Sequence, residues 1–524
     1  MLSSPDGIDA AQQLANRYEL QTATSNHGCP AVHMYVYAGS PQKVSQAMAS
    51  KWSNEHLRDL GPRPDVWLRE SGSEVDKTAT PSPIAEEYSV ASSPLVLATA
   101  DRATVAALGT QRPGNWAETF DKASRTDRGV LRPDPTTSST GELATALLYG
   151  IDQPADQPRA RAIEQLIGRT LDRDDYPLGD GLAMLCRQRE LTPPRNSMIV
   201  SEQAVLRFNT GAPLGGRCAA GTGRLSSQEQ LKAFYPSDTR GLDIRFARLS
   251  WSDASQGRAA ARFGDWLVSD DGQQTLLAVG LRPNGVTIRD PLSEQNGVLP
   301  GATVKDDPVP LEALRAAMRQ YDLAHRQGRV LLALDASGSM GAAVDNGQTR
   351  FTVAGEGVRR AIELMGQHDE FGLWLFASGR VGAAIQEPVP IGPRDGPVNG
   401  VSRRDAAVAA LSRTTPAGGT PLLRAIRDGV AAVGPSDDSR IRALVVLSDG
   451  EDTSSGLTLG QVKEAVAAAD VRIFVIAVGE THCAAETSRV LSADSGGACY
   501  DINAGDAGVQ LAEVFAALWG KAAR

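Results

Sequence analysis

The second half of the chain alternates short apolar runs with segments of helical periodicity. The apolar runs are typical of buried strands and lie at 330–335, 369–377, 442–449, 471–479 and 499–502. Helical spacing predicts helices at 351–366, 403–414, 420–433, 458–470, 483–493 and 509–523. Strands that are apolar throughout must be covered on both faces. The pattern therefore predicts a doubly wound, mostly parallel α/β sheet.

The chain is too long for one ordinary hydrophobic core, which predicts several domains. Residues 285–310 contain Pro, Gly and Asp without a sustained period and predict a linker, followed by a helix over 311–327. The front half mixes strands and helices more loosely, and its size fits two lobes around a cleft. We expect a two-lobed domain at 1–285, a linker and connecting helix at 286–325, and a second domain at 326–524.

In the front half, the predicted elements fall into two sets. Strand-like segments occur at 31–38, 65–69 and 94–100. Helical spacing occurs at 4–19, 41–56, 141–150 and 255–269.

Composition excludes several classes of function. The formal net charge of −9 argues against a nucleic-acid surface, which usually carries a basic patch. No phosphate-binding loop or zinc-type Cys/His spacing occurs, and the six histidines are scattered singly. No apolar run is long enough for a transmembrane helix, and the N-terminal stretch lacks the basic and apolar regions of a signal peptide.

The stretch DASGS places one acid and two hydroxyls at the mouth of a predicted strand. Asp335, Ser337 and Ser339 alternate, so their oxygens can face one point, as hard cations such as Mg²⁺ and Mn²⁺ require. Further ligands are expected from loops at the same sheet edge. Thr420 follows a Gly-Gly turn before a helix, and Asp449 stands at another strand end.

In these residues the sequence resembles the von Willebrand factor A domain. The metal-ion-dependent adhesion site (MIDAS) of that family reads Asp-x-Ser-x-Ser, then a threonine in a later loop, then an aspartate at a later strand end. The match runs in order through Asp335, Ser337, Ser339, Thr420 and Asp449, and the resemblance covers about residues 325–524.

The resemblance implies a doubly wound (Rossmann-like) fold and a binding mechanism. Ser337, Ser339 and either Thr420 or Asp449 would ligate Mg²⁺ or Mn²⁺ directly. Asp335 and the remaining member would act directly or through water. An Asp or Glu carboxylate of a partner protein would fill the open coordination position, which is binding and not catalysis.

Other interpretations of these motifs compete with metal binding. A lone Asp-x-Ser-x-Ser occurs by chance. A nucleophilic serine is disfavoured because no G-x-S-x-G elbow or loop histidine accompanies it. The S-x-x-K at 40–43 lacks a K-T-G partner, so an enzyme is not expected. Glu451 and Asp452 could add ligands but are more typical of a solvated loop face.

The front half resembles a type II periplasmic solute-binding protein, most clearly in PRPDVWLRES, SSPLVLATA, LRPDPTTSSTGELATALLYG and RFGDWLVSDDGQQTLLAVGLRPNG. The loop TTSSTG opens a helix whose free N–H groups favour an anion, although helix capping is the commoner role of such residues. Trp67 could line a cleft but is more often a core residue. The residues expected to contact a solute are Ser92, Ser93, Thr137, Ser138, Ser139 and Thr140.

Five cysteines bear on the cellular compartment. Cys483 and Cys499 flank a short helical segment and could form a disulfide, whereas pairing among Cys29, Cys186 and Cys218 is open, with Cys186–Cys218 favoured by proximity. Five reduced cysteines are the alternative.

The two resemblances together imply a bacterial cell-surface protein, so we expect an exported chain with its anchor or signal upstream. Two alternatives remain. One is a solute-capture, transport or sensing component whose C-terminal domain docks a partner. The other is an intracellular chelatase or ATPase accessory, which the absence of an ATPase motif disfavours.

Overall fold

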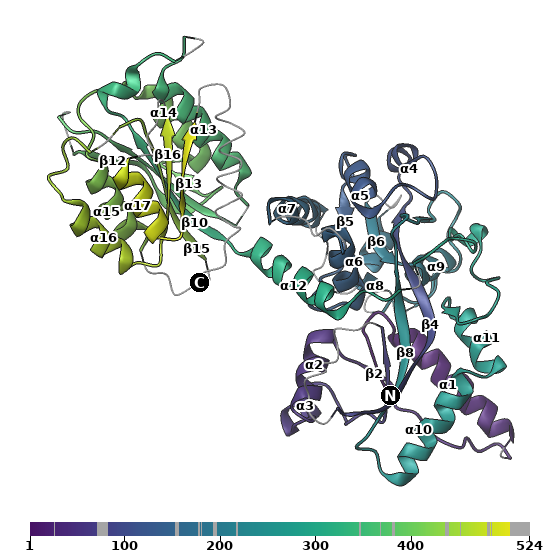
Figure 1. The fold of residues 1–524 in the computed structure, drawn as a ribbon. Helices are drawn as coiled ribbons and strands as arrows, with labels where there is room; N and C mark the ends of the chain where they lie inside the picture. The colour runs from purple at the N-terminus through teal and green to yellow at the C-terminus, as the bar shows by residue number, and fades with distance from the viewer. Residues whose placement is uncertain are drawn as a thin grey trace. The chain divides into compact units, whose positions relative to one another are not determined.

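The computed structural model describes residues 1–502 except 26, 71–81, 152–156, 175, 177–178, 180, 192–195, 216–217, 219, 306, 345–346, 367, 380–382, 435–439, 451, 479–482 and 484. The chain forms two compact units (Figure 1). Unit 1 comprises Met1–Ala155 and Ala162–Tyr321, and unit 2 comprises Asp156–Arg161 and Asp322–Arg524. The helix predicted at 509–523 lies outside the described residues. Within them, no helix has the length and apolar character needed to cross a membrane.

Unit 2 contains a six-stranded sheet in the order β12-β11-β10-β15-β16-β17. All neighbouring pairs are parallel except β11 with β12, which confirms the predicted parallel α/β sheet. Its strands are β10 (Gly328–Asp335), β11 (Glu370–Phe376), β12 (Ile385–Pro393), β15 (Ile441–Ser448), β16 (Arg472–Val478) and β17 (Ala498–Ile502). A small hairpin pairs β13 (Pro397–Val398) with β14 (Val401–Ser402).

Helices cover both faces of this sheet (Figure 1). They are α13 (Arg350–Leu364), α14 (Arg403–Arg413), α15 (Leu422–Val433), α16 (Leu459–Ala467) and α17 (Glu486–Asp494), with a 3₁₀ turn, η2 (Gly338–Gly341). Successive residues of β10 point to opposite faces. Leu332 and Leu334 therefore pack with α13 and α14, whereas Leu331 and Ala333 pack with α15 and α16.

The sequence pattern did not predict strand β12. Its sequence IQEPVPIGP contains three prolines, which cannot donate ladder hydrogen bonds and argue against a central strand. The structure resolves this by placing β12 at the edge of the sheet, where one side of the strand needs no partner.

Unit 1 is built on a nine-stranded sheet in the order β2-β1-β3-β8-β4-β6-β5, with β7 and β9 also pairing β4. Its strands are β1 (Leu2–Ser3), β2 (Tyr37–Ala38), β3 (Val66–Arg69), β4 (Ile84–Thr99), β5 (Val130–Leu131), β6 (Ser197–Ser201), β7 (Lys232–Phe234), β8 (Gly241–Leu249) and β9 (Arg282–Pro283). Residues 84–94 of β4 pair with β8, whereas its last residues pair with β6 and β7. This long strand therefore joins the two halves of the unit.

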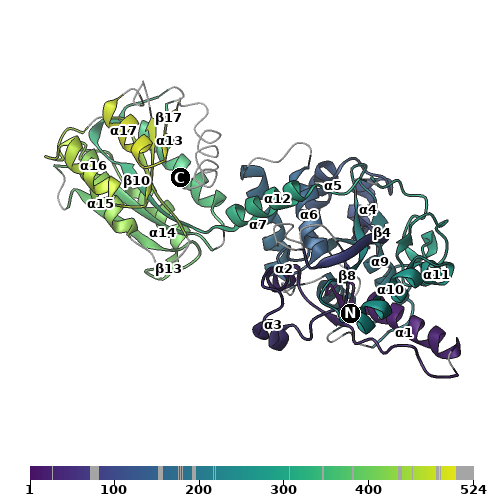
Figure 2. The same cartoon turned by 60° about the horizontal axis from the view of Figure 1, so that its bottom comes forward.

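The helices before β10 are α1 (Ile8–Ser25), α2 (Pro41–Ala49), α3 (Asn54–Asp59), α4 (Arg102–Leu108), α5 (Trp116–Ser124), α6 (Ser139–Tyr149), α7 (Gln157–Asp174), α8 (Gly181–Glu190), α9 (Glu202–Thr210), α10 (Ala254–Leu267), α11 (Asp270–Ala278) and α12 (Leu311–His325), with a 3₁₀ turn, η1 (Glu294–Asn296). Figure 2 shows α1, α10 and α11 next to one another. Helix α11 packs against both α1 and α10. The single helix predicted at 41–56 is divided into α2 and α3.

Hydrophobic clusters of unit 1 lie near both ends of β4. One contains Trp67, Ala247 and Leu249, so Trp67 is a core residue. The other contains Val96 and Ala98 and continues into the segment predicted as a linker, where Leu292 and Val298 are fully buried. This segment lacks periodicity but carries isolated apolar residues, and burying them holds it against unit 1 in place of a free linker.

Two disulfides cross-link the described chain. Cys186 pairs with Cys218 in unit 1, and Cys483 pairs with Cys499 in unit 2, as the spacing favoured. Cys29 is exposed and belongs to neither disulfide.

We predict that replacing both Cys483 and Cys499 by Ser destabilises unit 2. The disulfide spans a sequence separation of 16 residues, for which loop-closure entropy gives about 3 kcal/mol. Urea unfolding of the full chain measures the loss, and Cys29→Ser is the matched control that should unfold like the wild type. An unchanged midpoint, with mass spectrometry showing the wild-type disulfide oxidised, would contradict the prediction.

Candidate functional site

Two neighbouring strands of unit 2 end in carboxylates. Asp335 is the last residue of β10, and Asp449 directly follows the last residue of β15. The strands pair in parallel with Leu334 opposite Leu447, so both acids reach the same sheet edge. The Ser448 hydroxyl donates a hydrogen bond of 2.6 Å to Asp335 Oδ2 and ties the two strand ends together.

The loop after β10 arranges its two serines beside these acids. The Ser337 backbone N–H donates to Asp335 Oδ1 over 2.8 Å, which turns the chain sharply at the strand end. Ser337 Oγ and Ser339 Oγ lie 3.0 Å apart, and the Ser339 hydroxyl donates to Asp449 Oδ1 over 2.8 Å. Two hydroxyls and one carboxylate oxygen therefore form a continuous row.

Thr420 reaches the same place from a third loop. The Gly338 N–H donates to the Gly418 carbonyl over 2.9 Å, which joins this loop to the loop after β10. A Cβ atom on Gly450 would lie 3.9 Å from Thr420 Oγ1, so the threonine hydroxyl sits beside the residue that follows Asp449. The structure thus brings together all five residues that the motif singled out, and we call them the MIDAS cluster, after the motif from which the sequence predicted them.

The two acids of the MIDAS cluster are buried, whereas one of its serines is exposed to solvent. Asp335 has no exposed surface, Asp449 is 3% exposed, and Ser339 at the mouth is exposed. Burial raises the pKa of Asp335 to about 6, and the charge of Asp449 adds to this, while hydrogen bonds from Ser448 and Ser337 oppose it. Two carboxylates held close together in a dry site favour a neighbouring cation.

Asp452 has a structural role next to the cluster. Its Oδ1 accepts the Leu423 N–H over 3.0 Å at the start of α15, and its Oδ2 accepts the Ser455 hydroxyl over 2.5 Å. Asp452 thus bonds within its own loop and caps a helix, and Glu451 lies outside the described residues. Among the described residues, no three His, Cys, Asp or Glu side chains gather as a metal site. Cation binding here would therefore need the hydroxyls.

Sequence reasoning overlooked Arg350, which reaches the MIDAS cluster. It is the first residue of α13, and its guanidinium donates to Asp449 Oδ2 over 2.8 Å. A signal was present, because a positive charge at a helix N-terminus opposes the helix dipole and therefore calls for a partner outside the helix.

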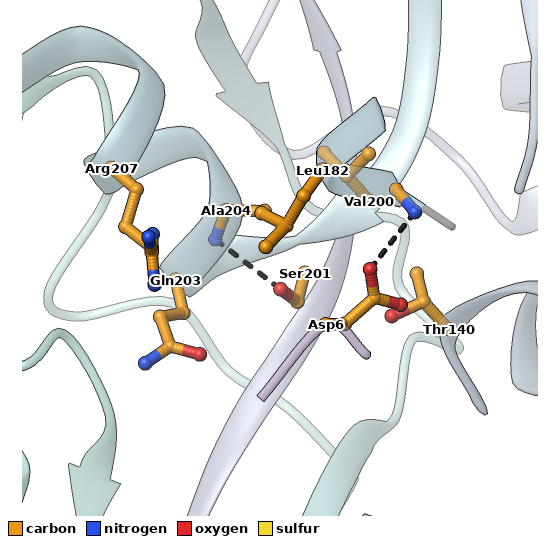
Figure 3. Close-up of a pocket in the computed structure, with 9 residues that line it drawn as sticks. Asp6, Thr140, Leu182, Val200, Ser201, Gln203, Ala204 and Arg207 are labelled. Carbon is orange, nitrogen blue, oxygen red and sulfur yellow. Dashed lines mark hydrogen bonds between the residues drawn. The ribbon is translucent and has the colours of Figure 1, made fainter. Parts of the chain in front are cut away.

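Unit 1 contains a small cavity at the N-terminal ends of α8 and α9 (Figure 3). It encloses about 10 Å³, which is about the space of one water molecule. The lining residues include Asp6, Thr140, Gly181, Gln203 and Arg207. Of the predicted solute contacts, Thr140 lines this cavity directly.

The side chain of Asp6 lies where the N-terminal ends of α6 and α8 meet. Its Oδ2 accepts the Ser138 hydroxyl over 2.5 Å at the N-cap of α6, and its Oδ1 accepts the Gly181 N–H over 2.8 Å at the start of α8. Figure 3 shows the carboxylate of Asp6 beside Thr140. The chain's own carboxylate therefore takes the place that helix N-termini offer to an anion.

Among the other predicted solute contacts, the side chains of Ser93, Ser138 and Thr137 form hydrogen bonds within the chain. Ser93 Oγ accepts the Gln203 N–H over 3.1 Å at the start of α9, while Ser92 pairs with Asp243 between β4 and β8. Ser138 caps α6, Ser139 is buried, and the Thr137 hydroxyl donates to the Asp134 carbonyl over 3.4 Å. Capping, the commoner role, describes several of these residues.

Residues 1–282 match a family described as bacterial extracellular solute-binding protein. No curated protein matches the chain.

Several solved structures are similar to parts of the chain. The conserved hypothetical protein BatB from Bacteroides thetaiotaomicron is 19% identical over 36% of this chain and 98% of its own, with a TM-score of 0.29. A von Willebrand factor type A protein from Catenulispora acidiphila is 20% identical over 36% and 42%, with a TM-score of 0.31. A ferric binding protein from Campylobacter jejuni is 12% identical over 62% and 98%, with a TM-score of 0.43.

We predict that Asp6→Ala destabilises unit 1 and that small carboxylates partly restore it. The substitution leaves the Ser138 hydroxyl and the Gly181 N–H without their acceptor, which costs about 1–3 kcal/mol. Formate or acetate should raise the melting temperature of the variant more than that of the wild type, as measured by thermal melting.

The matched control is Asp59→Ala, an exposed acid at the end of α3. It should melt like the wild type with either anion. Equal responses of Asp6→Ala and Asp59→Ala to formate would show that the carboxylate of Asp6 does not fill an anion position.

Proposed function

Because the chain belongs to the bacterial extracellular solute-binding protein family, we propose that it is an extracytoplasmic binding protein whose unit 2 binds a partner protein through a divalent cation. Family membership and the two disulfides support the location, since disulfides persist in oxidising compartments. We also propose that the protein is attached to the cell surface and that it binds its partner without catalysing a reaction. The cation, Mg²⁺ or Mn²⁺, would lie in the MIDAS cluster.

One observation carries this proposal, namely the spacing of the oxygens in the MIDAS cluster. Octahedral Mg²⁺ has metal–oxygen distances of about 2.1 Å, so adjacent ligands lie about 3.0 Å apart. Ser337 Oγ and Ser339 Oγ are 3.0 Å apart, and Ser339 Oγ is 2.8 Å from Asp449 Oδ1. Both spacings therefore suit adjacent ligands of such a site, and hydroxyl and carboxylate oxygens are ligands that hard cations accept.

The residues of the MIDAS cluster would have different roles in holding a cation. Ser337, Ser339 and either Thr420 or Asp449 would contact it, while Asp335 holds the Ser337 N–H and the Ser448 hydroxyl in place. When bound, the cation supplies a positive charge with a position open to a partner's Asp or Glu carboxylate. The exposed Ser339 puts that position at the surface, where a second protein can reach it.

Solute capture is the second candidate function. The family of unit 1 favours a small-molecule ligand. At the loop predicted to contact a solute, however, a ligand would have to displace Asp6 from the N-terminal ends of α6 and α8, and the cavity there has room for about one water molecule. A larger pocket of unit 1, of about 310 Å³, is lined by residues that include Tyr35, Asp65 and Phe263, and by none of the residues predicted to contact a solute. The MIDAS cluster, with an exposed mouth, is the better supported binding site.

We predict that divalent cations stabilise the wild type but not Asp335→Ala. A ligand that binds only the folded state at a hundredfold excess over its Kd adds about 2.7 kcal/mol. The full chain is melted with EDTA, Mg²⁺, Mn²⁺ and Ca²⁺. The melting temperature of the wild type should rise with Mg²⁺ or Mn²⁺, and EDTA should reverse the rise.

Loss of a buried acid can disturb folding by itself, so Ser339→Ala tests the same point with an exposed hydroxyl. Its matched control is Ser412→Ala, an exposed serine on α14. Ser339→Ala should lose most of the cation response, and Ser412→Ala should keep it. A wild type that melts identically in EDTA and in every cation would refute the proposed function.

A further inference from the structure

Arg350 and the row of hydroxyls share a single carboxylate. The Asp449 side chain has no exposed surface, and its Oδ2 accepts the Arg350 guanidinium over 2.8 Å. Its Oδ1 accepts the Ser339 hydroxyl over 2.8 Å. One oxygen therefore faces the place proposed for the cation, and the other faces a fixed positive charge.

The position of Arg350 in its own helix does not explain this contact. Arg350 opens α13 after the N-cap Thr349, and its backbone N–H donates to the Ala342 carbonyl over 3.0 Å. The first turn of α13 contains no acid, and the residues three and four positions later are Val353 and Ala354. A cation at a helix N-terminus is unfavourable, so the carboxylate of Asp449 is what compensates for it.

The charges at this edge of the sheet favour either the Arg350 guanidinium or a divalent cation beside Asp449, but not both together. Without a cation, burying the carboxylate of Asp449 is costly unless a positive group pairs with it. Arg350 provides that group. A divalent cation on the other side of the same carboxylate would lie close to the guanidinium, and like charges at that separation repel each other strongly where water is scarce.

Resting on the function proposed above, we propose that Arg350 is the counter-ion of Asp449 in the metal-free state and competes with the divalent cation for this carboxylate. Its side chain is 27% exposed, so it has a path to swing into solvent as the cation enters. The ion pair between Arg350 and Asp449 stabilises unit 2 when no metal is bound. It also raises the cation concentration that the site needs. Arg350 thus sets the threshold at which the MIDAS cluster becomes competent to bind a partner.

The test uses the full chain with Arg350→Gln, which keeps a polar side chain and removes the charge. Free Mn²⁺ is counted by electron paramagnetic resonance during titration, and melting is followed in EDTA and in saturating Mn²⁺. We expect Arg350→Gln to melt below the wild type in EDTA and to bind Mn²⁺ about tenfold more tightly or better. The rise in melting temperature caused by Mn²⁺ should therefore be larger than in the wild type.

Two variants serve as controls. Arg359→Gln removes an exposed arginine of the same helix that pairs with Glu356, and it should match the wild type in both measurements. Arg350→Lys keeps the charge, so its Mn²⁺ affinity should stay close to that of the wild type. It also provides a folded variant if Arg350→Gln does not fold.

The outcomes separate this inference from the proposed function. Equal or weaker Mn²⁺ binding by Arg350→Gln, while the wild type binds, would overturn the competition and leave the cation site standing. An Arg350→Lys variant that binds as tightly as Arg350→Gln would overturn it as well, because charge would not be the cause. Binding by Arg350→Gln alone would support it. Absence of Mn²⁺ binding in every variant would refute the cation site and the competition together.

Discussion

The parallel pairing of β10 with β15 is the constraint on which the candidate site depends. Placing Leu334 opposite Leu447 brings Asp335 and Asp449 to the carboxyl edge of one sheet, although 113 positions separate the two bonded residues Asp335 and Ser448 in the sequence. A slip of one residue would turn every side chain of the strand to the other face. Leucine and valine side chains buried on both faces prevent that slip, so the core of unit 2 sets the geometry of its surface loops.

The two units show the same electrostatic principle with opposite signs. At the edge of unit 2, two buried carboxylates gather in a dry place, and Arg350 supplies a positive charge. In unit 1, the N-terminal ends of α6 and α8 meet, and Asp6 supplies the negative charge. In each unit the chain brings its own counter-charge to a place that attracts an external ion, because uncompensated buried charge is costly. If an external ion entered either place, it would compete with a residue of the protein for the same partner.

Much of unit 2 was predictable because its signals are local. Apolar runs ending in Asp335 and Asp449 indicated strand ends, and parallel strands present those ends on one edge. The edge strand β12 was missed because its prolines disfavour a central strand. In unit 1, the segment containing Leu292 and Val298 has no period and was predicted as a linker, yet these residues are buried. Isolated apolar residues without periodicity carry no information about which core will bury them.

The sequence by itself determined the strand–helix alternation, the residues of the MIDAS cluster and the chemistry of their oxygens, because periodicity and side-chain type are properties of short segments. Only the tertiary structure decided which groups complete each site. Arg350 lies 99 positions before Asp449, and Asp6 lies 132 positions before Ser138. Such pairs form where separate elements pack together, and the energy that selects them is the cost of leaving a buried charge or a helix end without a partner. No local pattern in the sequence records that cost.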